Sequence, residues 1–407
     1  MINPMTPDQA KAFRRRLLAW YRKHRRDLPW REMAGRSVNA YHVLLSEAML
    51  QQTQVATVVP YFHRFIEAFP TVQALAEADE QQVLTLWQGL GYYRRARNLH
   101  AAANRIVVEH GGEVPASVKD LLNLPGVGPY TAGAITSIAH GTRAAVVDGN
   151  VERVFARLLL IEDPINAPAT KKRVWSIAED FVPKSSPGDY NQALMELGAT
   201  VCTPKLPKCF VCPVRDHCRG VQETNPERLP IKLAKKKPRE VTHVVIAAER
   251  NGKHLFEQRP SEGLWSNMWQ MPTWEEPVEK RDRSRRVTTR RTNNDALAPA
   301  RPPGSDPVAS STDLIDWFRE RFGLSLDTPQ QTTDFTHQTT HRTIRFVVLR
   351  ASVQSGRLKP NAGVWRKLGQ LDDLPMSNPQ HRAVESLYKL EAPSKRLFKR
   401  PGVSRNV

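Results

Sequence analysis

The spacing of apolar residues changes near residue 240. Before that point, apolar residues recur three and four positions apart, as in "PYFHRFIEAFPTVQALA" and "NVERVFARLLLIED", which is typical of amphipathic helices. No convincing alternating strand occurs before about residue 200. After it, "VTHVVIAAERNGKHLFEQRP" contains two strand-like runs around Asn251-Gly252, a strong hairpin signal. The pattern predicts an all-α domain followed by an α+β domain.

The second domain is interrupted by a segment with almost nothing to bury. Charged, Pro and small polar residues dominate residues 277–309, so we expect a disordered insertion there. Order is predicted to return with the helix "STDLIDWFRERFGL", the strand "TIRFVVLRASV" and the helix "NPQHRAVESLYKL". The predicted domains are residues 1–220, a basic linker at 221–240, a second domain at 241–395 and a basic tail at 396–407.

The charge of the chain adds a class of binding partner to this prediction of the fold. Its 407 residues carry a formal charge of +19, which favours a phosphate-rich partner such as nucleic acid, although a solvated basic tail would also account for it. No run approaches the ~18 apolar residues of a membrane span, and the N-terminal segment lacks the apolar centre of a signal peptide. We therefore expect a cytoplasmic, reduced protein without a membrane partner.

All four cysteines lie in "CTPKLPKCFVCPVRDHC", at Cys202, Cys209, Cys212 and Cys218. In a reducing compartment this clustering favours a metal centre over a disulfide framework. Four thiolates so close in sequence suit either a tetrahedral zinc ion or one [4Fe-4S] cluster, and their spacing alone does not separate the two.

The stretch "NLPGVGPYTAGAI" places Gly126 and Gly128 between two predicted helical segments. Glycines can leave backbone N–H groups exposed at the start of a helix, where the helix dipole favours an anion. A tight helix-to-helix turn explains the same letters without any ligand. The pattern alone does not decide between a phosphate-binding site and a simple turn.

Two carboxylates stand out because each occupies an unusual position. Glu47 shares a helical stripe with Val43 and Leu50, so it interrupts an apolar face, and burial would raise its pKa towards neutrality. Asp148 precedes a predicted helix, where the dipole favours its ionised form. A protonated and an ionised carboxyl together can cleave a glycosidic bond. The alternatives are a salt-bridged glutamate and a plain N-cap.

These motifs resemble the adenine DNA glycosylase family of the helix-hairpin-helix superfamily. The matching segments are "DLPWR", "SEAMLQQTQV", "GLGYYRRARNLH", "LPGVGPYTAGAI", "VVDGNVERV", "NQALMELGA" and the cysteine loop. The resemblance implies one [4Fe-4S] cluster on the four cysteines, a hairpin that binds a DNA phosphate through its backbone amides, and contacts of Lys205 and Lys208 with DNA. Solubilising charge is the simpler explanation of these two lysines.

The resemblance also implies roles for individual residues. Glu47 would be the general acid and Asp148 would stabilise the sugar cation, while Tyr130 and Asn150 would orient these carboxylates. Related enzymes that also cut the backbone have a lysine nucleophile at position 130. A phenol cannot form the Schiff base that such lyase chemistry needs, so the sequence points to base removal by water alone.

Further residues would bind the substrate in the same family. The resemblance implies that Trp30, Arg31 and Gln192 line an adenine pocket. Gln52 and Tyr92 would enter the duplex as the base is flipped, since the target atoms are hidden in the stack. Core packing or helix capping remains the simpler explanation of the tyrosine and the glutamines.

The second domain resembles the Nudix-like domain that recognises 8-oxoguanine in this family. Phe335, Thr336 and His337 occupy the position of the family's Phe-Ser-His reading loop. Threonine keeps the hydroxyl and adds a methyl group. No glutamate-rich magnesium-binding helix follows Gly263, so recognition without pyrophosphate hydrolysis is expected.

The sequence therefore predicts a monomeric, monofunctional glycosylase that removes adenine opposite 8-oxoguanine or guanine in double-stranded DNA during base excision repair. Replication or repair proteins are candidate partners. The main alternative is a glycosylase of the same superfamily that acts on another mispair or on a pyrimidine lesion. A non-catalytic DNA-binding module is disfavoured because Glu47 and Asp148 are both present, and a Nudix-type nucleotide hydrolase because its glutamate helix is missing.

Overall fold

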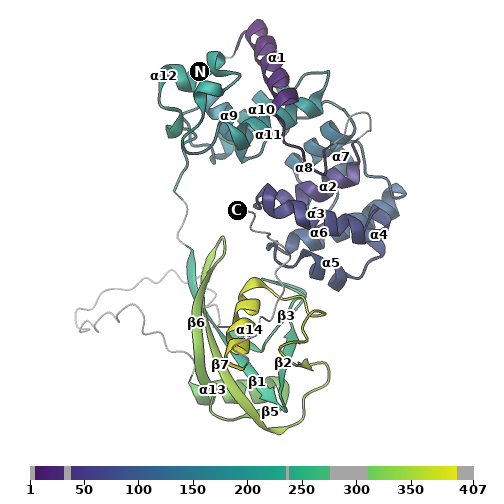
Figure 1. The fold of residues 1–407 in the computed structure, drawn as a ribbon, viewed down its shortest axis with the longest axis vertical. Helices are drawn as coiled ribbons and strands as arrows, with labels where there is room; N and C mark the ends of the chain where they lie inside the picture. The colour runs from purple at the N-terminus through teal and green to yellow at the C-terminus, as the bar shows by residue number, and fades with distance from the viewer. Residues whose placement is uncertain (1–4, 32–37, 235–237, 276–309, 392–407) are drawn as a thin grey trace, which may run out of the picture. The chain divides into compact units, whose positions relative to one another are not determined.

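The computed structural model describes residues 5–31, 38–234, 238–275 and 310–391. The chain forms two compact units, Met1–Lys235 and Lys236–Val407, which Figure 1 shows as a helical part and a part built on a sheet. The expected insertion at 277–309 and the basic tail at 396–407 lie outside the described residues. No helix among the described residues has both the length and the apolar character needed to cross a membrane.

The first unit is helical throughout its described residues, as predicted, and contains no β-strand there. Its α-helices are α1 Pro7–His24, α2 Ala40–Leu50, α3 Val55–Ala68, α4 Val72–Glu77, α5 Glu80–Trp87, α6 Arg94–His110, α7 Val118–Leu121, α8 Pro129–Ala134, α9 Gly149–Leu158, α10 Pro168–Phe181, α11 Pro187–Thr200 and α12 Arg219–Glu223. Shorter turns are η1 Ile135–Ala139, η2 Cys209–Val211, η3 Arg215–His217 and η4 Pro226–Arg228.

Local sequence explains where the helices of the functional region begin. Thr6 and Gln9 form a capping box at the start of α1, and the side chain of Asn39 caps α2 by accepting from two backbone N–H groups. Phe13 and Leu17 of α1 are fully buried in a core shared with α9, α10 and α11. This packing holds the helices that later supply the site.

The helical segment that follows the two glycines is not a continuous α-helix, because α8 passes into the π-helical turn η1 after Ala134. Gly133 approaches the carbonyl of Ala145 so closely that a Cβ would overlap with it. The buried Ser137 donates a hydrogen bond back to the carbonyl of Gly133 at 2.7 Å. A wider turn is thus accommodated where the chain is crowded.

In its described residues, the second unit contains a sheet of eight strands and two helices. The hairpin predicted at Asn251-Gly252 is present: both residues have positive φ, and Arg250 pairs with Lys253. β1 runs parallel to β7 along most of its length, whereas β6 and β7 are antiparallel. The strands are β1 Arg239–Arg250, β2 Lys253–Gln258, β3 Trp269–Gln270, β4 Thr273–Glu275, β5 Leu324–Leu326, β6 Gln330–Gln338, β7 Arg342–Gly356 and β8 Val364–Arg366.

Each helix of this unit covers one face of the sheet. Helix α14 Asn378–Glu391 contributes to one core together with Val245 and Phe346, whereas α13 Ser311–Phe322 contributes to the other core together with Val244. Because neighbouring residues of a strand point to opposite faces, these two cores lie on opposite sides of the sheet. The unit is the α+β domain expected from the sequence.

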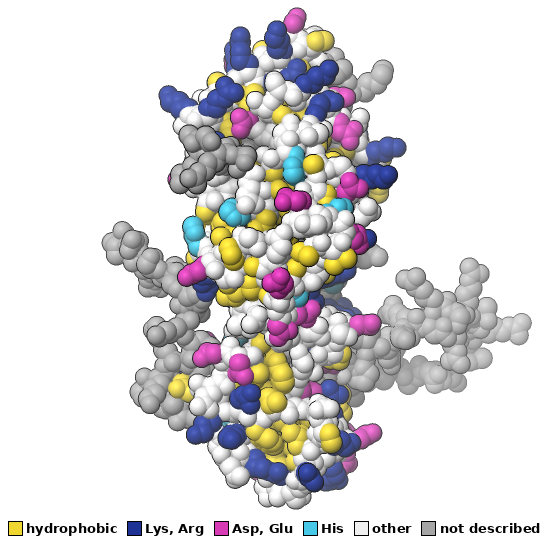
Figure 2. Space-filling model, turned by 90° about the vertical axis from the view of Figure 1, so that its right-hand side faces the viewer, with side chains coloured by type: hydrophobic (Ala, Val, Ile, Leu, Met, Phe, Trp, Pro, Cys, Tyr) yellow, Lys and Arg dark blue, Asp and Glu magenta, His cyan; other side chains and the backbone are white. Residues whose placement is uncertain are grey.

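Positive charge gathers on the surface of the first unit. Figure 2 shows Lys and Arg side chains clustered at the end of this unit that contains α1 in Figure 1. The helix itself has the sequence PDQAKAFRRRLLAWYRKH, with six Lys and Arg residues around its buried apolar positions. Such a surface attracts polyanions.

Candidate active site

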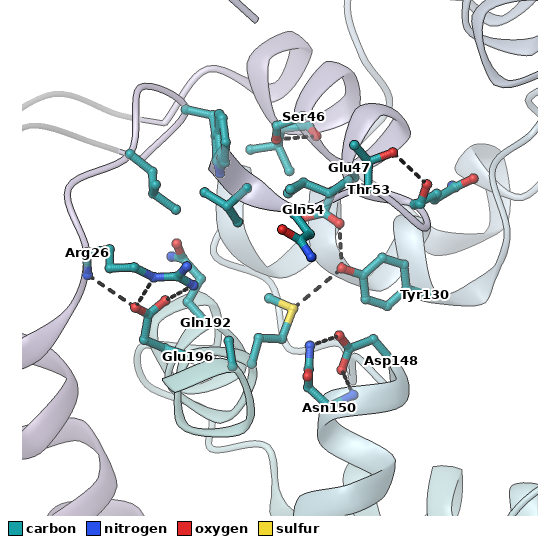
Figure 3. Close-up of a pocket in the computed structure, with 18 of the residues that line it drawn as sticks. Arg26, Ser46, Glu47, Thr53, Gln54, Tyr130, Asp148, Asn150, Gln192 and Glu196 are labelled. Carbon is teal, nitrogen blue, oxygen red and sulfur yellow. Dashed lines mark hydrogen bonds and ion pairs between the residues drawn. The ribbon is translucent and has the colours of Figure 1, made fainter. Parts of the chain in front are cut away.

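A cavity of about 1040 Å³ in the first unit collects residues from α2, α8, α9 and α11 together with the segments that precede α2 and α3. Figure 3 shows the labelled side chains around this cavity, with Glu47 on one side of Tyr130 and Asp148 on the other. The structure brings eight of the expected site residues to this one cavity. They are Trp30, Arg31, Glu47, Gln52, Tyr130, Asp148, Asn150 and Gln192.

Glu47 is the buried carboxyl of the cavity. It lies in the middle of α2 and is only 5% exposed. The hydroxyl of Tyr130 donates to its Oε2 across 2.5 Å. The pKa of Glu47 is raised to about 7: burial is the main cause and the nearby Asp148 adds to the rise, whereas the hydrogen bond from Tyr130 opposes it. The group can therefore be protonated near neutral pH.

Asp148 has a different environment because it caps α9. Its Oδ1 accepts from the backbone N–H groups of Asn150 and Val151 at 2.9 and 2.7 Å, and its Oδ2 accepts from Nδ2 of Asn150 at 2.8 Å. Burial raises the pKa of Asp148 above its ordinary value, while these three hydrogen bonds lower it. The donors favour the ionised carboxylate, as the helix dipole does. Burial opposes them, so the pKa is not lowered as the position before a helix had suggested.

Tyr130 links Glu47 to α11. Its hydroxyl also lies 3.5 Å from Sδ of Met195. Burial, followed by the negative charges of Glu47 and Asp148, raises the pKa of Tyr130 well above its ordinary value. The phenol is neutral at physiological pH and acts as a hydrogen-bond donor.

A buried ion-pair group that the sequence pattern did not reveal lies at the opposite wall of the cavity. Glu196 accepts from Nε of Arg26 at 2.6 Å and from a terminal nitrogen of Arg31 at 2.7 Å. These two cations lower the pKa of Glu196 against the effect of its burial. The one signal available was its position four residues after Gln192 on α11, which places both on one helix face.

Asn150 is itself held from behind by an arginine. A terminal nitrogen of Arg153 donates to Oδ1 of Asn150 at 2.8 Å and to the carbonyl of Gly198 at 2.7 Å. Its Nε donates to the carbonyl of Cys202 at 2.7 Å. Because Oδ1 of Asn150 is occupied, its Nδ2 is the end that faces Asp148.

Gln52 and Tyr92, the residues expected to enter the duplex, both have positive φ, at 59° and 50°. Such backbone conformations cost roughly 1–3 kcal/mol in non-glycine residues and concentrate at functional sites. Tyr92 is 51% exposed, an unusual position for a large aromatic side chain. A buried core role, the simpler explanation of this tyrosine, does not fit its exposure.

The glycines of the hairpin differ from each other. Gly126 has a φ of 76°, the left-handed region that favours glycine. Gly128 is extended, with φ −98° and ψ 179°, and caps α8. A Cβ at Gly128 would meet no atom within 4 Å. Gly126 therefore uses a backbone conformation that other residues avoid, whereas Gly128 does not.

The cysteine loop follows α11 and packs against the core of the first unit. The four cysteines are partly buried and form no disulfide. Burial and neighbouring thiols raise the pKa of Cys212 to about 12, and the pKa values of Cys209 and Cys218 rise for the same reasons. A terminal nitrogen of Arg157 lies 3.3 Å from Sγ of Cys202. Neighbouring thiols whose charged forms repel one another fit a cationic metal centre that would offset this repulsion.

The arrangement of the loop's side chains concerns both the cysteines and the two lysines between them. Within the described part of the chain, no group of three or more His, Cys, Asp or Glu side chains is arranged to hold a metal ion. Lys205 and Lys208 are exposed in the first half of the cysteine loop. They are not part of the cavity that contains Glu47.

In the second unit, Phe335, Thr336 and His337 lie in strand β6, paired with β7, so the expectation of a loop is wrong. Strand alternation separates their side chains: Phe335 is buried and stacks on Phe346 with ring centroids 5.3 Å apart, whereas Thr336 is exposed. His337 lies 5.9 Å from the ring of Trp265. The hydroxyl of Thr336 and the two rings thus face opposite sides of the strand.

Comparison with known proteins places this geometry in a family. The HhH-GPD superfamily base excision DNA repair protein model matches residues 45–180, and the NUDIX domain model matches residues 243–386. Adenine DNA glycosylase from Schizosaccharomyces pombe is 35% identical over 330 residues, which cover 67% of this chain and 72% of that protein. The chain belongs to the adenine DNA glycosylase family. It combines the helical HhH-GPD domain of this family with a C-terminal Nudix-like domain.

Other relatives of the adenine DNA glycosylase family match over a smaller share of their length. The Homo sapiens adenine DNA glycosylase is 40% identical over 319 residues, which cover 66% of this chain. This chain spans 58% of the length of that relative. Among solved structures, a thermostable thymine-DNA glycosylase aligns with a TM-score of 0.47 at 29% identity, covering 53% of this chain and 98% of the other.

Proposed function

We propose that the chain is a monofunctional DNA glycosylase that removes adenine mispaired with 8-oxoguanine or guanine from double-stranded DNA. The observation that carries this proposal is the hydrogen bond from Tyr130 to Glu47, in a cavity that also contains Asp148. A carboxyl with a pKa of about 7 and a second carboxylate held by N–H donors make a suitable pair for glycosidic cleavage. Family membership supports adenine as the base and base excision repair as the process.

In this mechanism the two carboxyls act on the two sides of the glycosidic bond, Glu47 on the adenine and Asp148 on the sugar. Glu47 donates its proton to the five-membered ring of the flipped adenine, so the base leaves with the electron pair of the glycosidic bond. Asp148 faces the anomeric carbon and stabilises its positive charge, while Asn150 and Tyr130 hold the two carboxyls in place. Water then adds to the anomeric carbon and loses a proton. Tyr130 offers no amine for a Schiff base, so backbone cleavage is not expected.

Substrate binding is assigned to the remaining residues of the cavity and to the hairpin. Trp30, Arg31 and Gln192 would surround the adenine, since all three line the cavity. Gln52 and Tyr92 would fill the space that the base leaves in the duplex. The backbone at Gly126 and Gly128, together with Lys205 and Lys208, would hold DNA phosphates.

We assign recognition of 8-oxoguanine to the Nudix-like unit, at the strand segment that contains Phe335, Thr336 and His337. The exposed hydroxyl of Thr336 can donate and accept a hydrogen bond. Phe335 would hold this strand in place from its buried face, where it stacks on Phe346. Without a magnesium-binding glutamate helix, pyrophosphate hydrolysis is not part of the proposed activity.

The substrate proposal is tested with synthetic duplexes that carry adenine opposite 8-oxoguanine, guanine or thymine. We expect adenine release from the first two and none from the correct pair with thymine. The product strand should retain an intact backbone until it is treated with alkali. Release of thymine or an oxidised pyrimidine, with adenine untouched, would instead support the alternative glycosylase.

The pH profile of adenine release should depend on Glu47. Since the acid must be protonated and its pKa is about 7, single-turnover rates should fall up to tenfold per pH unit above that value. The hydrogen bond from Tyr130 stabilises the charged form of Glu47 and so lowers its pKa. Tyr130→Phe removes this donor, so the descending limb of the variant should move to higher pH. A limb that stays in place in this variant would contradict the role given to Tyr130.

We propose that Cys202, Cys209, Cys212 and Cys218 hold one [4Fe-4S] cluster, which when bound would cross-link the loop through four thiolate bonds. The purified protein is expected to contain about four irons per chain and to absorb visible light in the region typical of such clusters. Cys212→Ser should lower the iron content and lower the midpoint of thermal unfolding of the first unit. Zinc without iron on metal analysis would refute the assignment.

A further inference from the structure

Arg95 is a buried arginine at the start of α6 that takes no part in the mechanism above. It is 9% exposed, and burial lowers its pKa to about 10, so it remains charged at neutral pH. Its terminal nitrogens donate to neutral oxygens on two separate segments. These are the carbonyls of Ala48 and Met49 with the hydroxyl of Thr53 on one segment, and the carbonyls of Leu90 and Gly91 on the other.

The two segments are those that carry the strained residues described above. Thr53 immediately follows Gln52, and Gly91 immediately precedes Tyr92. Ala48 and Met49, at the end of α2, directly follow Glu47. Contacts at 2.6 Å to Met49, 3.2 Å to Thr53 and 3.0 Å to Gly91 therefore join one guanidinium to the end of α2 and to the immediate neighbours of Gln52 and Tyr92.

Aromatic contacts complete the fixation of Arg95. Its guanidinium lies 5.2 Å from the ring centroid of Trp87 and 5.7 Å from that of Tyr92. Nε1 of Trp87 donates to the carbonyl of Gly91 at 3.1 Å, so the indole holds the same turn. A planar guanidinium spreads five N–H donors over a rigid fork, whereas the ammonium of lysine has three on a single nitrogen and cannot span the same set of acceptors.

We propose that Arg95 is a positioning residue that presets Gln52 and Tyr92 for insertion into the duplex. This inference rests on the proposed function and adds the group that determines how fast the target base is flipped. A free protein that already holds both residues in their strained conformations need not order two loops after it meets DNA. Loss of the guanidinium would let both segments relax towards ordinary φ values and move the inserting side chains.

The test compares opening of a duplex with chemistry on a base that needs less opening. Stopped-flow fluorescence of 2-aminopurine placed opposite 8-oxoguanine reports unstacking, and adenine opposite an abasic site reports chemistry. For Arg95→Met we expect unstacking about 10- to 100-fold slower. Adenine release opposite the abasic site should stay within about threefold of wild type, and Arg95→Lys should recover little of the unstacking rate.

Arg94→Met is the matched control, because Arg94 is exposed on the same helix. It removes the same charge and should leave the unstacking rate within about threefold of wild type at fixed salt. If Arg95→Met does not fold, Thr53→Val removes one of the five contacts and should still slow unstacking measurably. Unchanged unstacking in the folded variant, or equal loss on both duplexes, would overturn the positioning role. Absence of adenine release by the wild type would count against the proposed function instead.

Discussion

Glu47→Gln is expected to lower single-turnover release of adenine opposite 8-oxoguanine by about 10³-fold, within the range typical of general acid catalysis. Glutamine has nearly the same shape and can accept the hydrogen bond that Tyr130 donates to Glu47 at 2.5 Å. It has no acidic proton for the leaving base. DNA affinity should therefore be preserved while the chemical step is lost, which a gel-shift titration and rapid-quench measurement on the same duplex can separate.

Glu67→Gln is a suitable control for this prediction, because it is the same substitution at an exposed position of α3. Its release rate should stay within about twofold of wild type. A Glu47→Gln variant that retains more than a tenth of the wild-type rate would remove Glu47 from the role of acid. In that case the pH profile of the wild type should also lack a descending limb near pH 7.

The same variant has a consequence for stability that shows whether it is folded. The pKa of Glu47 is raised in the folded chain from 4.5 to about 7, so the folded state binds more protons than the unfolded state between these values. Unfolding free energy is therefore lost as the pH rises through this window, by roughly 3 kcal/mol at most. Glu47→Gln lacks this loss and should be more stable than wild type at pH 8 but not at pH 4.

Sequence patterns were sufficient for those features that depend on neighbouring residues. The helical spacing of Glu47 among apolar positions predicted a buried carboxyl, and Asp148 before "GNVERVF" predicted an N-cap. The hairpin at Asn251-Gly252 follows from residues that tolerate positive φ. Each of these is set within one or two turns of chain, where propensity and spacing act directly.

Features formed between distant segments could not be obtained this way. Tyr130 and Glu47 are 83 residues apart, and Glu196 and Arg31 are 165 apart. The local pattern around each of these residues does not determine which distant residue it contacts. Arg95 illustrates the difficulty most clearly, because "GLGYYRRARNLH" contains three arginines and only packing selects the one that is buried.

Strand pairing was the other source of error. Phe335, Thr336 and His337 were expected in a loop because a resemblance supplied their role without their register. Pairing of β6 with β7 extends through these residues, with Phe335 opposite Phe346. A strand that alternates its side chains cannot present all three to one ligand. Of the three residues, only Thr336 is exposed.

Asp148→Asn should be the second variant with a large effect, lowering adenine release by about 10²- to 10³-fold. Asparagine can still cap α9 by accepting from the N–H groups of Asn150 and Val151. It brings no negative charge to the anomeric carbon. Its side-chain amide would also face Nδ2 of Asn150, which now donates to the carboxylate at 2.8 Å, so two donors would meet.

The control for this variant is Glu152→Gln, a half-buried acid in the first turn of the same helix. It should release adenine within about threefold of the wild-type rate. The melting temperatures of both variants should lie close to that of the wild type, because the cap is retained. Full activity of Asp148→Asn, together with inactive Glu47→Gln, would reduce Asp148 to a helix cap and leave the sugar cation to be stabilised by another group. Loss of activity in both, with DNA binding intact, is the result that two carboxyls of unlike environment predict.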